Sequence, residues 1–138
     1  MKTKHPAVNI TLSLLAVLGL FAFTGCQKEI RPVVIDPTGI YNLVSVDGKT
    51  VPCALTHEGM TPTIKSGMFT INTNGSCTSL ITFSVPERGD MRREVKASYT
   101  LNGAELTMRW EGAGMTKGQI QGNQFTMTNE GMIFSYRK

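Results

Sequence analysis

The feature that most constrains the fold is an alternation of apolar and polar residues that begins near Gly39 and continues almost to the end of the chain. A period of two places apolar side chains on one face of a strand and polar side chains on the other, as in antiparallel sheets. The clearest stretch is residues 93–101, where the inward positions would be Val95, Ala97, Tyr99 and Leu101. This region shows no helical periodicity, so an all-β fold is expected.

Turn-forming dipeptides separate the alternating stretches: Asp47-Gly48, Asn74-Gly75, Asn102-Gly103 and Gly122-Asn123. They favour hairpins between antiparallel strands. The predicted strands are residues 40–46, 49–55, 67–72, 76–85, 93–101, 105–110, 117–121, 124–128 and 132–137, with loops at 56–65 and 86–90. Pro52 should place the second of these strands at an edge or a bend, because proline lacks the N–H that a sheet uses. This order predicts an antiparallel up-and-down β-barrel of about eight strands.

A secretory signal precedes this domain. An apolar run over residues 10–23 follows a positively charged start and ends at Phe23-Thr24-Gly25-Cys26, which has the form of a lipobox. We therefore expect residues 1–25 to be a lipoprotein signal peptide and Cys26 to carry fatty acyl chains such as palmitate. The alternatives are an uncleaved membrane anchor, for which the run is short of the ~20 residues that span a bilayer, and a plain signal cut near Ala22.

Lipidation would hold the mature chain at a membrane of the cell envelope. The bacterial type of lipidated terminus carries three chains, and several chains anchor durably. Gln27 follows Cys26, and the absence of aspartate there resembles proteins sorted to the outer membrane, facing the periplasm or the surface, if the source is Gram-negative. Residues 26–38 contain two prolines, so we expect them to form an extended tether. Residues 39–138 are expected to form the barrel domain.

The remaining cysteines are Cys53 and Cys77, an even pair in an exported chain. A disulfide between them is expected in an oxidising compartment. Two buried free thiols, or half of a metal site, are the alternatives. His57 is the one histidine near either cysteine, which makes zinc a weak interpretation.

Little in the mature chain predicts catalysis. His57 lies in a predicted loop and has no second histidine or acidic cluster to work with, so neither an enzyme nor a cofactor or metal site is expected. Nucleic acid is not expected as a partner, because Lys2 and Lys4 leave with the signal and no basic stripe remains.

Methionine is abundant, with seven in the mature chain. Met108 and Met127 alternate with aromatic residues as core positions do, although methionine also suits adaptable ligand walls and cuprous ion. The inner wall should include Leu43, Ile71, Leu106 and Tyr136 besides the ligand-contacting residues. The residues predicted to contact a ligand are Tyr41, Phe69, Tyr99, Met108, Trp110, Phe125, Met127 and Phe134.

Three stretches resemble small bacterial lipocalin-like lipoproteins: residues 39–48 followed by Pro52, residues 67–72 with Asn74-Gly75-Ser76, and residues 131–137. The resemblance covers nearly the whole mature domain. It implies a lipocalin-like barrel with its first and last strands paired. Two functions are then open: binding of a small apolar or amphipathic ligand, or a filled barrel that acts as a protein-interaction or inhibitor module through its outer surface. Binding is the preferred interpretation.

The lipobox makes a direct prediction. Cys26→Ala removes the thiol that would receive lipid, so this variant should remain an unprocessed precursor without fatty acid. Metabolic labelling with palmitate, compared with the wild type, measures this. Normal labelling of Cys26→Ala would contradict the assignment.

Overall fold

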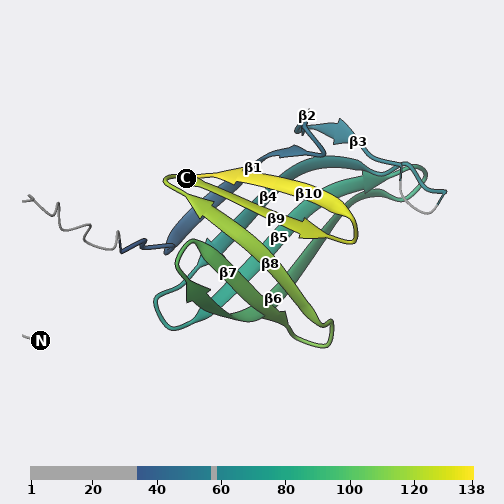
Figure 1. Cartoon of the computed structure of the whole chain (residues 1–138). Helices are drawn as coiled ribbons and strands as arrows, with labels where there is room; N and C mark the ends of the chain where they lie inside the picture. The colour runs from purple at the N-terminus through teal and green to yellow at the C-terminus, as the bar shows by residue number, and fades with distance from the viewer. Residues whose placement is uncertain (1–33, 57–58) are drawn as a thin grey trace, which may run out of the picture. The chain divides into compact units, whose positions relative to one another are not determined.

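The computed structural model describes residues 34–56 and 59–138, which belong to one compact unit, Pro32–Lys138. The predicted signal peptide 1–25, the lipidation site Cys26, the first part of the tether and His57 lie outside the described residues. Within the described ranges there are ten strands and no helix (Figure 1). The strands are β1 (Gly39–Val46), β2 (Lys49–Thr50), β3 (Cys53–Ala54), β4 (Thr63–Ile71), β5 (Ser76–Val85), β6 (Gly89–Asn102), β7 (Glu105–Trp110), β8 (Met115–Gln121), β9 (Gln124–Asn129) and β10 (Met132–Arg137).

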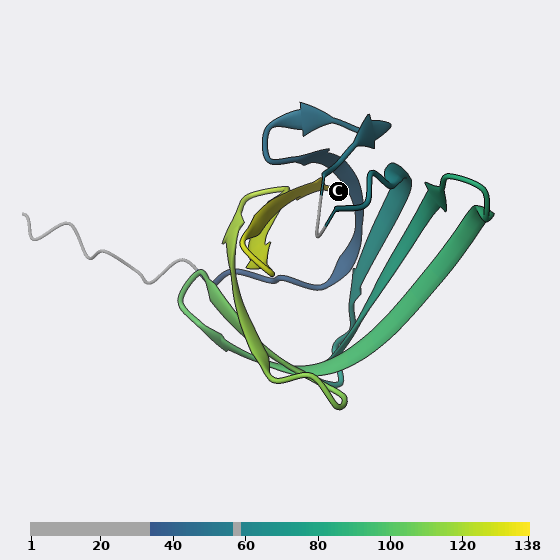
Figure 2. The same cartoon turned by 90° about the vertical axis from the view of Figure 1, so that its right-hand side faces the viewer.

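Eight of these strands close into a barrel. From β4 to β10 each strand pairs antiparallel with the next one along the chain, and β1 pairs with both β4 and β10. The strands therefore curve around a common interior with no open edge between the first and the last (Figure 2). The predicted architecture, an antiparallel up-and-down barrel of about eight strands, is confirmed.

The strands β2 and β3 are short additions at one end of the barrel. β1 pairs with β4 only along Gly39–Asn42, and beyond this point β1 pairs with β2 while β4 pairs with β3. Residues 49–55 were expected to form one short strand, but a bend at Val51 and Pro52 divides it in two. The bend agrees with the position of proline outside regular ladders.

Two strands each begin four residues earlier than the alternation predicts. β4 begins at Thr63 rather than at residue 67, and β6 begins at Gly89 rather than at residue 93. Both extensions pair with β5, as in Thr63 with Ser84 and Gly89 with Val85. Backbone pairing with a long neighbour thus holds exposed polar residues in strands, which is a tertiary effect that hydrophobic periodicity does not report.

One half of the barrel interior is filled by aromatic side chains. The Phe69 ring lies 4.7 Å from Phe125 and 5.6 Å from Tyr136, and Tyr41 meets Phe125 edge-on at 5.9 Å. The Tyr41 hydroxyl donates to the carbonyl of Pro37 at 2.8 Å, and the Lys138 ammonium lies 5.0 Å from the centre of its ring. Both ends of the described chain therefore close this end of the barrel, which we call the closed end.

The predicted disulfide between Cys53 and Cys77 is wrong for this structure, in which both thiols are free. Cys53 pairs with Ile64 near the start of β4, whereas Cys77 pairs with Ile71 at its end. The stretch from Ile64 to Ile71 spans about 23 Å at ~3.3 Å per residue, and a disulfide needs alpha carbons within about 7 Å. The register of β4, which the cysteine count does not contain, separates the two thiols.

The two thiols should differ in reactivity. Cys53 is half-buried, whereas Cys77 is fully buried and desolvation raises its pKa to about 12. In a Cys26→Ser background at pH 8, iodoacetamide should modify Cys53 in the native protein and both cysteines only after denaturation, as read by mass spectrometry. Cys53→Ser should leave the native protein unmodified. A native mass two hydrogens lower would instead reveal the disulfide.

Burial of the Cys77 thiol should also make the free energy of unfolding depend on pH. The folded pKa of Cys77 lies above the ordinary thiol value of 9.0. Its contribution to stability is therefore complete below about pH 9 and is lost as the pH rises toward about 12. Cys77→Ala should reduce this alkaline loss of stability in urea titrations.

Gly118 on β8 allows a close approach between strands. A β-carbon at this position would overlap the ring of Phe125 and would lie 2.9 Å from the backbone oxygen of Thr126. Gly118→Ala should therefore lower the free energy of unfolding by about 1–3 kcal/mol through overpacking, as measured by urea denaturation. The exposed neighbour Gln119→Ala is the control and should change it by less than about 0.5 kcal/mol. Equal stability of the two variants would contradict the packing described.

Candidate ligand-binding cavity

The other half of the barrel contains a cavity of about 340 Å³. It opens at the end opposite the closed end, because its rim includes Ala113 from the β7–β8 turn, Glu130 from the β9–β10 turn and Pro62 just before β4. Most of its wall is apolar. The wall residues central to the site are Ile81, Phe83, Val95, Trp110, Met127 and Phe134. A volume of this size lies within the range of small-molecule sites, about 300–1,000 Å³.

Three of the eight predicted ligand-contacting residues line this cavity: Trp110, Met127 and Phe134. The other five lie outside its lining and belong to the filled half of the core: Tyr41, Phe69, Tyr99, Met108 and Phe125. All eight occupy inward positions, as the alternation predicts. Their height along the barrel axis decides which of them face free space, and that height follows from the strand register.

Several wall residues were not predicted as ligand contacts. Ile81, Phe83 and Val95 share the inward parity of the predicted set, so the same alternation could have included them. Ser79 is buried on the same face of β5, but a serine gives no apolar signal. Arg93 pairs with Ile81 and has the same inward parity on β6, but a charged residue is not predicted to line an apolar cavity.

Trp110 connects the two halves of the interior. Its indole N–H donates to the hydroxyl of Thr116 on β8 at 2.8 Å. The ring also meets Phe69 of the filled half edge-on, with the ring centres 6.2 Å apart. The indole is therefore held in place on one side and faces the cavity on the other, which makes its emission a reporter of the cavity.

Two buried polar residues line the inner end of the cavity, which is the end next to the aromatic cluster. Tyr136 is 1% exposed and Ser79 is 4% exposed, and both belong to the lining. Within the described part of the chain the Tyr136 hydroxyl has no hydrogen-bond partner. Burial raises the pKa of Tyr136 well above its usual range, and the nearby Ser79 hydroxyl opposes this rise without completing a hydrogen bond. Tyr136 therefore stays protonated and can donate.

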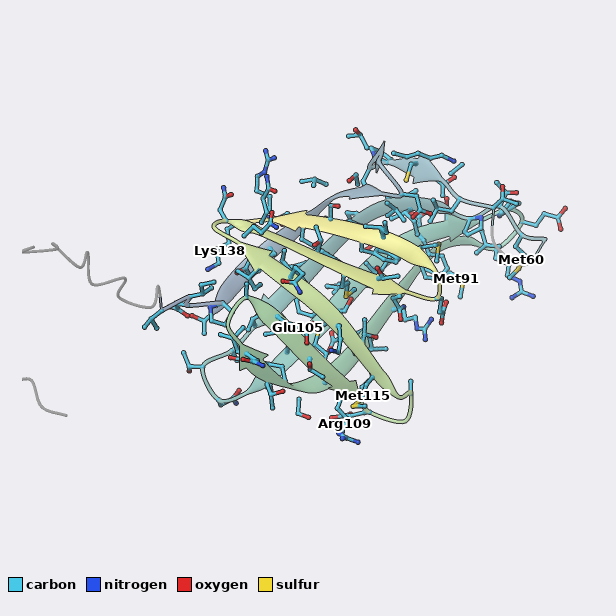
Figure 3. All side chains as sticks on the ribbon, viewed as in Figure 1. Met60, Met91, Glu105, Arg109, Met115 and Lys138 are labelled. Carbon is cyan, nitrogen blue, oxygen red and sulfur yellow. The ribbon has the colours of Figure 1, made fainter. Side chains whose placement is uncertain are left out.

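The described ranges contain no group of three or more histidine, cysteine, aspartate or glutamate side chains that could hold a metal ion. The exposed methionines do not gather either: Met115 lies well apart from Met60 and Met91 (Figure 3). Within residues 34–56 and 59–138, no helix is long and apolar enough to cross a membrane. The cavity is the feature of this part of the molecule that best suits a ligand.

No family model and no curated protein matches the chain. Two similar solved structures are the fluorescent protein UnaG and a point mutant of it. The wild-type protein shares 16% identity with this chain at a TM-score of 0.32, covering 73% of this chain and 96% of its own. The mutant shares 16% identity at a TM-score of 0.35, covering 73% and 94%. Values this low carry no weight, so the assignment of the barrel rests on its own closed strand pairing.

Proposed function

We propose that the chain binds one small apolar or amphipathic molecule inside its barrel and does so as a lipid-anchored protein of the cell envelope. The observation that carries the binding role is the cavity of about 340 Å³ in the open half of the barrel. Its wall is mainly apolar and combines aromatic, aliphatic and methionine side chains with few polar groups, as ligand pockets do. Burial of an apolar ligand against this wall would supply about 25 cal/mol per Å² of ligand area removed from water.

The envelope location rests on the signal and lipobox and is compatible with the position of the cavity. Residues 34–38 lead into β1 at Gly39, which pairs with Ile71 at the closed end. The cavity opens at the opposite end of the barrel. A tether attached at Cys26 would therefore reach the barrel away from the opening and leave it accessible for exchange of a ligand.

The alternative, a filled barrel that acts through its outer surface, is less well supported. Only one half of the interior is filled. The large apolar side chains exposed on the described surface are spread over several strands and loops: Val34, Ile40, Val44, Met60, Met91, Leu101, Met115 and Ile133. Scattered exposure of this kind is normal for monomeric proteins and does not by itself indicate a partner.

Binding can be measured through Trp110, the single tryptophan. Fatty acids, isoprenoids and phospholipids titrated into residues 26–138 carrying Cys26→Ser should change its emission saturably. A ligand at 100 times its Kd should also stabilise the fold by about 2.7 kcal/mol. Val95→Phe, which fills part of the cavity, should weaken binding about tenfold or more, because overpacking costs about 1–3 kcal/mol.

Lys96→Phe is the matched control, since this exposed neighbour of Val95 on β6 lies outside the cavity lining. It should bind as the wild type does. Flat titrations across the whole panel would contradict the binding role and leave the interaction role in its place.

A further inference from the structure

We infer that the ligand enters with a polar end first, and that this end is an uncharged hydrogen-bond acceptor held by the hydroxyls of Tyr136 and Ser79. The inference rests on the proposed binding function and adds the chemical class and the orientation of the ligand. An amphipathic molecule with a carbonyl, ester or alcohol oxygen at one end and an apolar body has this chemistry.

The three tyrosines differ in whether their hydroxyls have a hydrogen-bond partner. The Tyr41 hydroxyl donates to the carbonyl of Pro37 at 2.8 Å, and the Tyr99 hydroxyl donates to the carbonyl of Asn72 at 2.7 Å. Tyr136 is the third tyrosine of the chain, and its buried hydroxyl has no partner among the described residues. Buried polar groups in proteins are nearly always hydrogen-bonded, so an unpaired hydroxyl on a residue that lines a cavity points to a partner that binds there.

The ring of Tyr136 is fixed by its neighbours. It stacks on Phe125 with the ring centres 5.6 Å apart and an angle of 28° between the planes, and it meets Phe69 at 5.6 Å. Leu43 and Phe125 flank it across the sheet. The hydroxyl is therefore held in one place before a ligand arrives, which reduces the entropic cost of forming the hydrogen bond.

Ser79 supplies a second hydroxyl in the lining of the cavity. It lies on the inward face of β5 between Cys77 and Ile81, at a position where the neighbouring residues are apolar. Both residues line the same cavity, although no hydrogen bond joins their hydroxyls. A ligand oxygen that accepts from these hydroxyls would supply the partner that the Tyr136 hydroxyl lacks among the described residues.

The charges around the cavity favour an uncharged acceptor. Arg93 is the one cationic residue of the described lining, and it is exposed. Arg93 pairs with Ile81, whereas Ser79 pairs with Val95. Arg93 therefore lies one inward position nearer to the opening than the level of Ser79. A carboxylate at the inner end would lose its water without meeting a cation at that depth, which is costly. A neutral acceptor needs only the hydroxyls.

The wall between the inner end and the opening determines the length and the apolar character of the ligand body. Ile81 and Phe83 follow Ser79 along the inward face of β5, and Trp110 and Met127 face the same space. The distance from Ser79 to Phe83 along the strand is about 13 Å at ~3.3 Å per residue. An unbranched apolar segment of about this length fits between the hydroxyls and the solvent.

Three probes of equal chain length test this class: undecane, 2-undecanone and undecanoic acid, titrated at neutral pH into residues 26–138 with Cys26→Ser. The ketone should bind more tightly than the acid. Tyr136→Phe should weaken binding of the ketone about fivefold to tenfold, the effect of one hydrogen bond, while leaving the affinity for the alkane unchanged. Ser79→Ala should weaken ketone binding in the same direction.

Tyr41→Phe is the matched control, because it removes a tyrosine hydroxyl at the closed end. It should lower the melting temperature, since the Pro37 carbonyl loses its donor, and should leave all three affinities unchanged. Tyr136→Phe should not lower the melting temperature, because it removes a group without a protein partner.

The outcomes separate the two levels of inference. Unchanged ketone binding in both Tyr136→Phe and Ser79→Ala would overturn the polar-end assignment while the binding function stands. Tightest binding of the acid, lost in Arg93→Gln, would overturn the uncharged class. Absence of binding for all three probes and for the broader panel would overturn the binding function itself.

Discussion

The pairing of β1 with both β4 and β10 is the interaction on which the rest of the structure depends. It joins the first and last parts of the sheet, so each long strand has two neighbours and one enclosed face. Residues that merely alternate along separate strands become the wall of a common interior. Without this closure the aromatic cluster would have no opposite side to pack against, and the cavity would be an open face of a sheet.

The interior is filled unequally along its axis. Rings from β1, β4, β9 and β10 meet at the closed end, where Lys138 covers Tyr41 and the hydroxyl of that tyrosine reaches back to Pro37. At the open end β1 and β4 diverge, and the short strands β2 and β3 pair with them instead. A filled end gives the barrel its packing energy, and an open end leaves room for another molecule.

The polar groups follow the same division. Tyrosine hydroxyls at the closed end are satisfied by backbone carbonyls. The hydroxyl of Tyr136, which lies between the filled half and the cavity, has no partner in the described part of the chain. Such an exception to full hydrogen bonding is costly in a core but useful at a binding site. The stacked ring that holds this hydroxyl also belongs to the cluster that stabilises the fold, so the residue that we propose to recognise the ligand also contributes to stability.

The sequence by itself determined that the chain is all-β, that it forms about eight long antiparallel strands, and which parity of each strand points inward, because a period of two is a local property. It also determined the turn at Asp47-Gly48 and the break at Pro52. Only the tertiary structure decided how far β4 and β6 extend, that Cys53 and Cys77 lie at different heights, and that Phe69 packs while Phe83 faces the cavity. These depend on strand register and stagger around a closed barrel, which are set by pairing between residues distant in the chain.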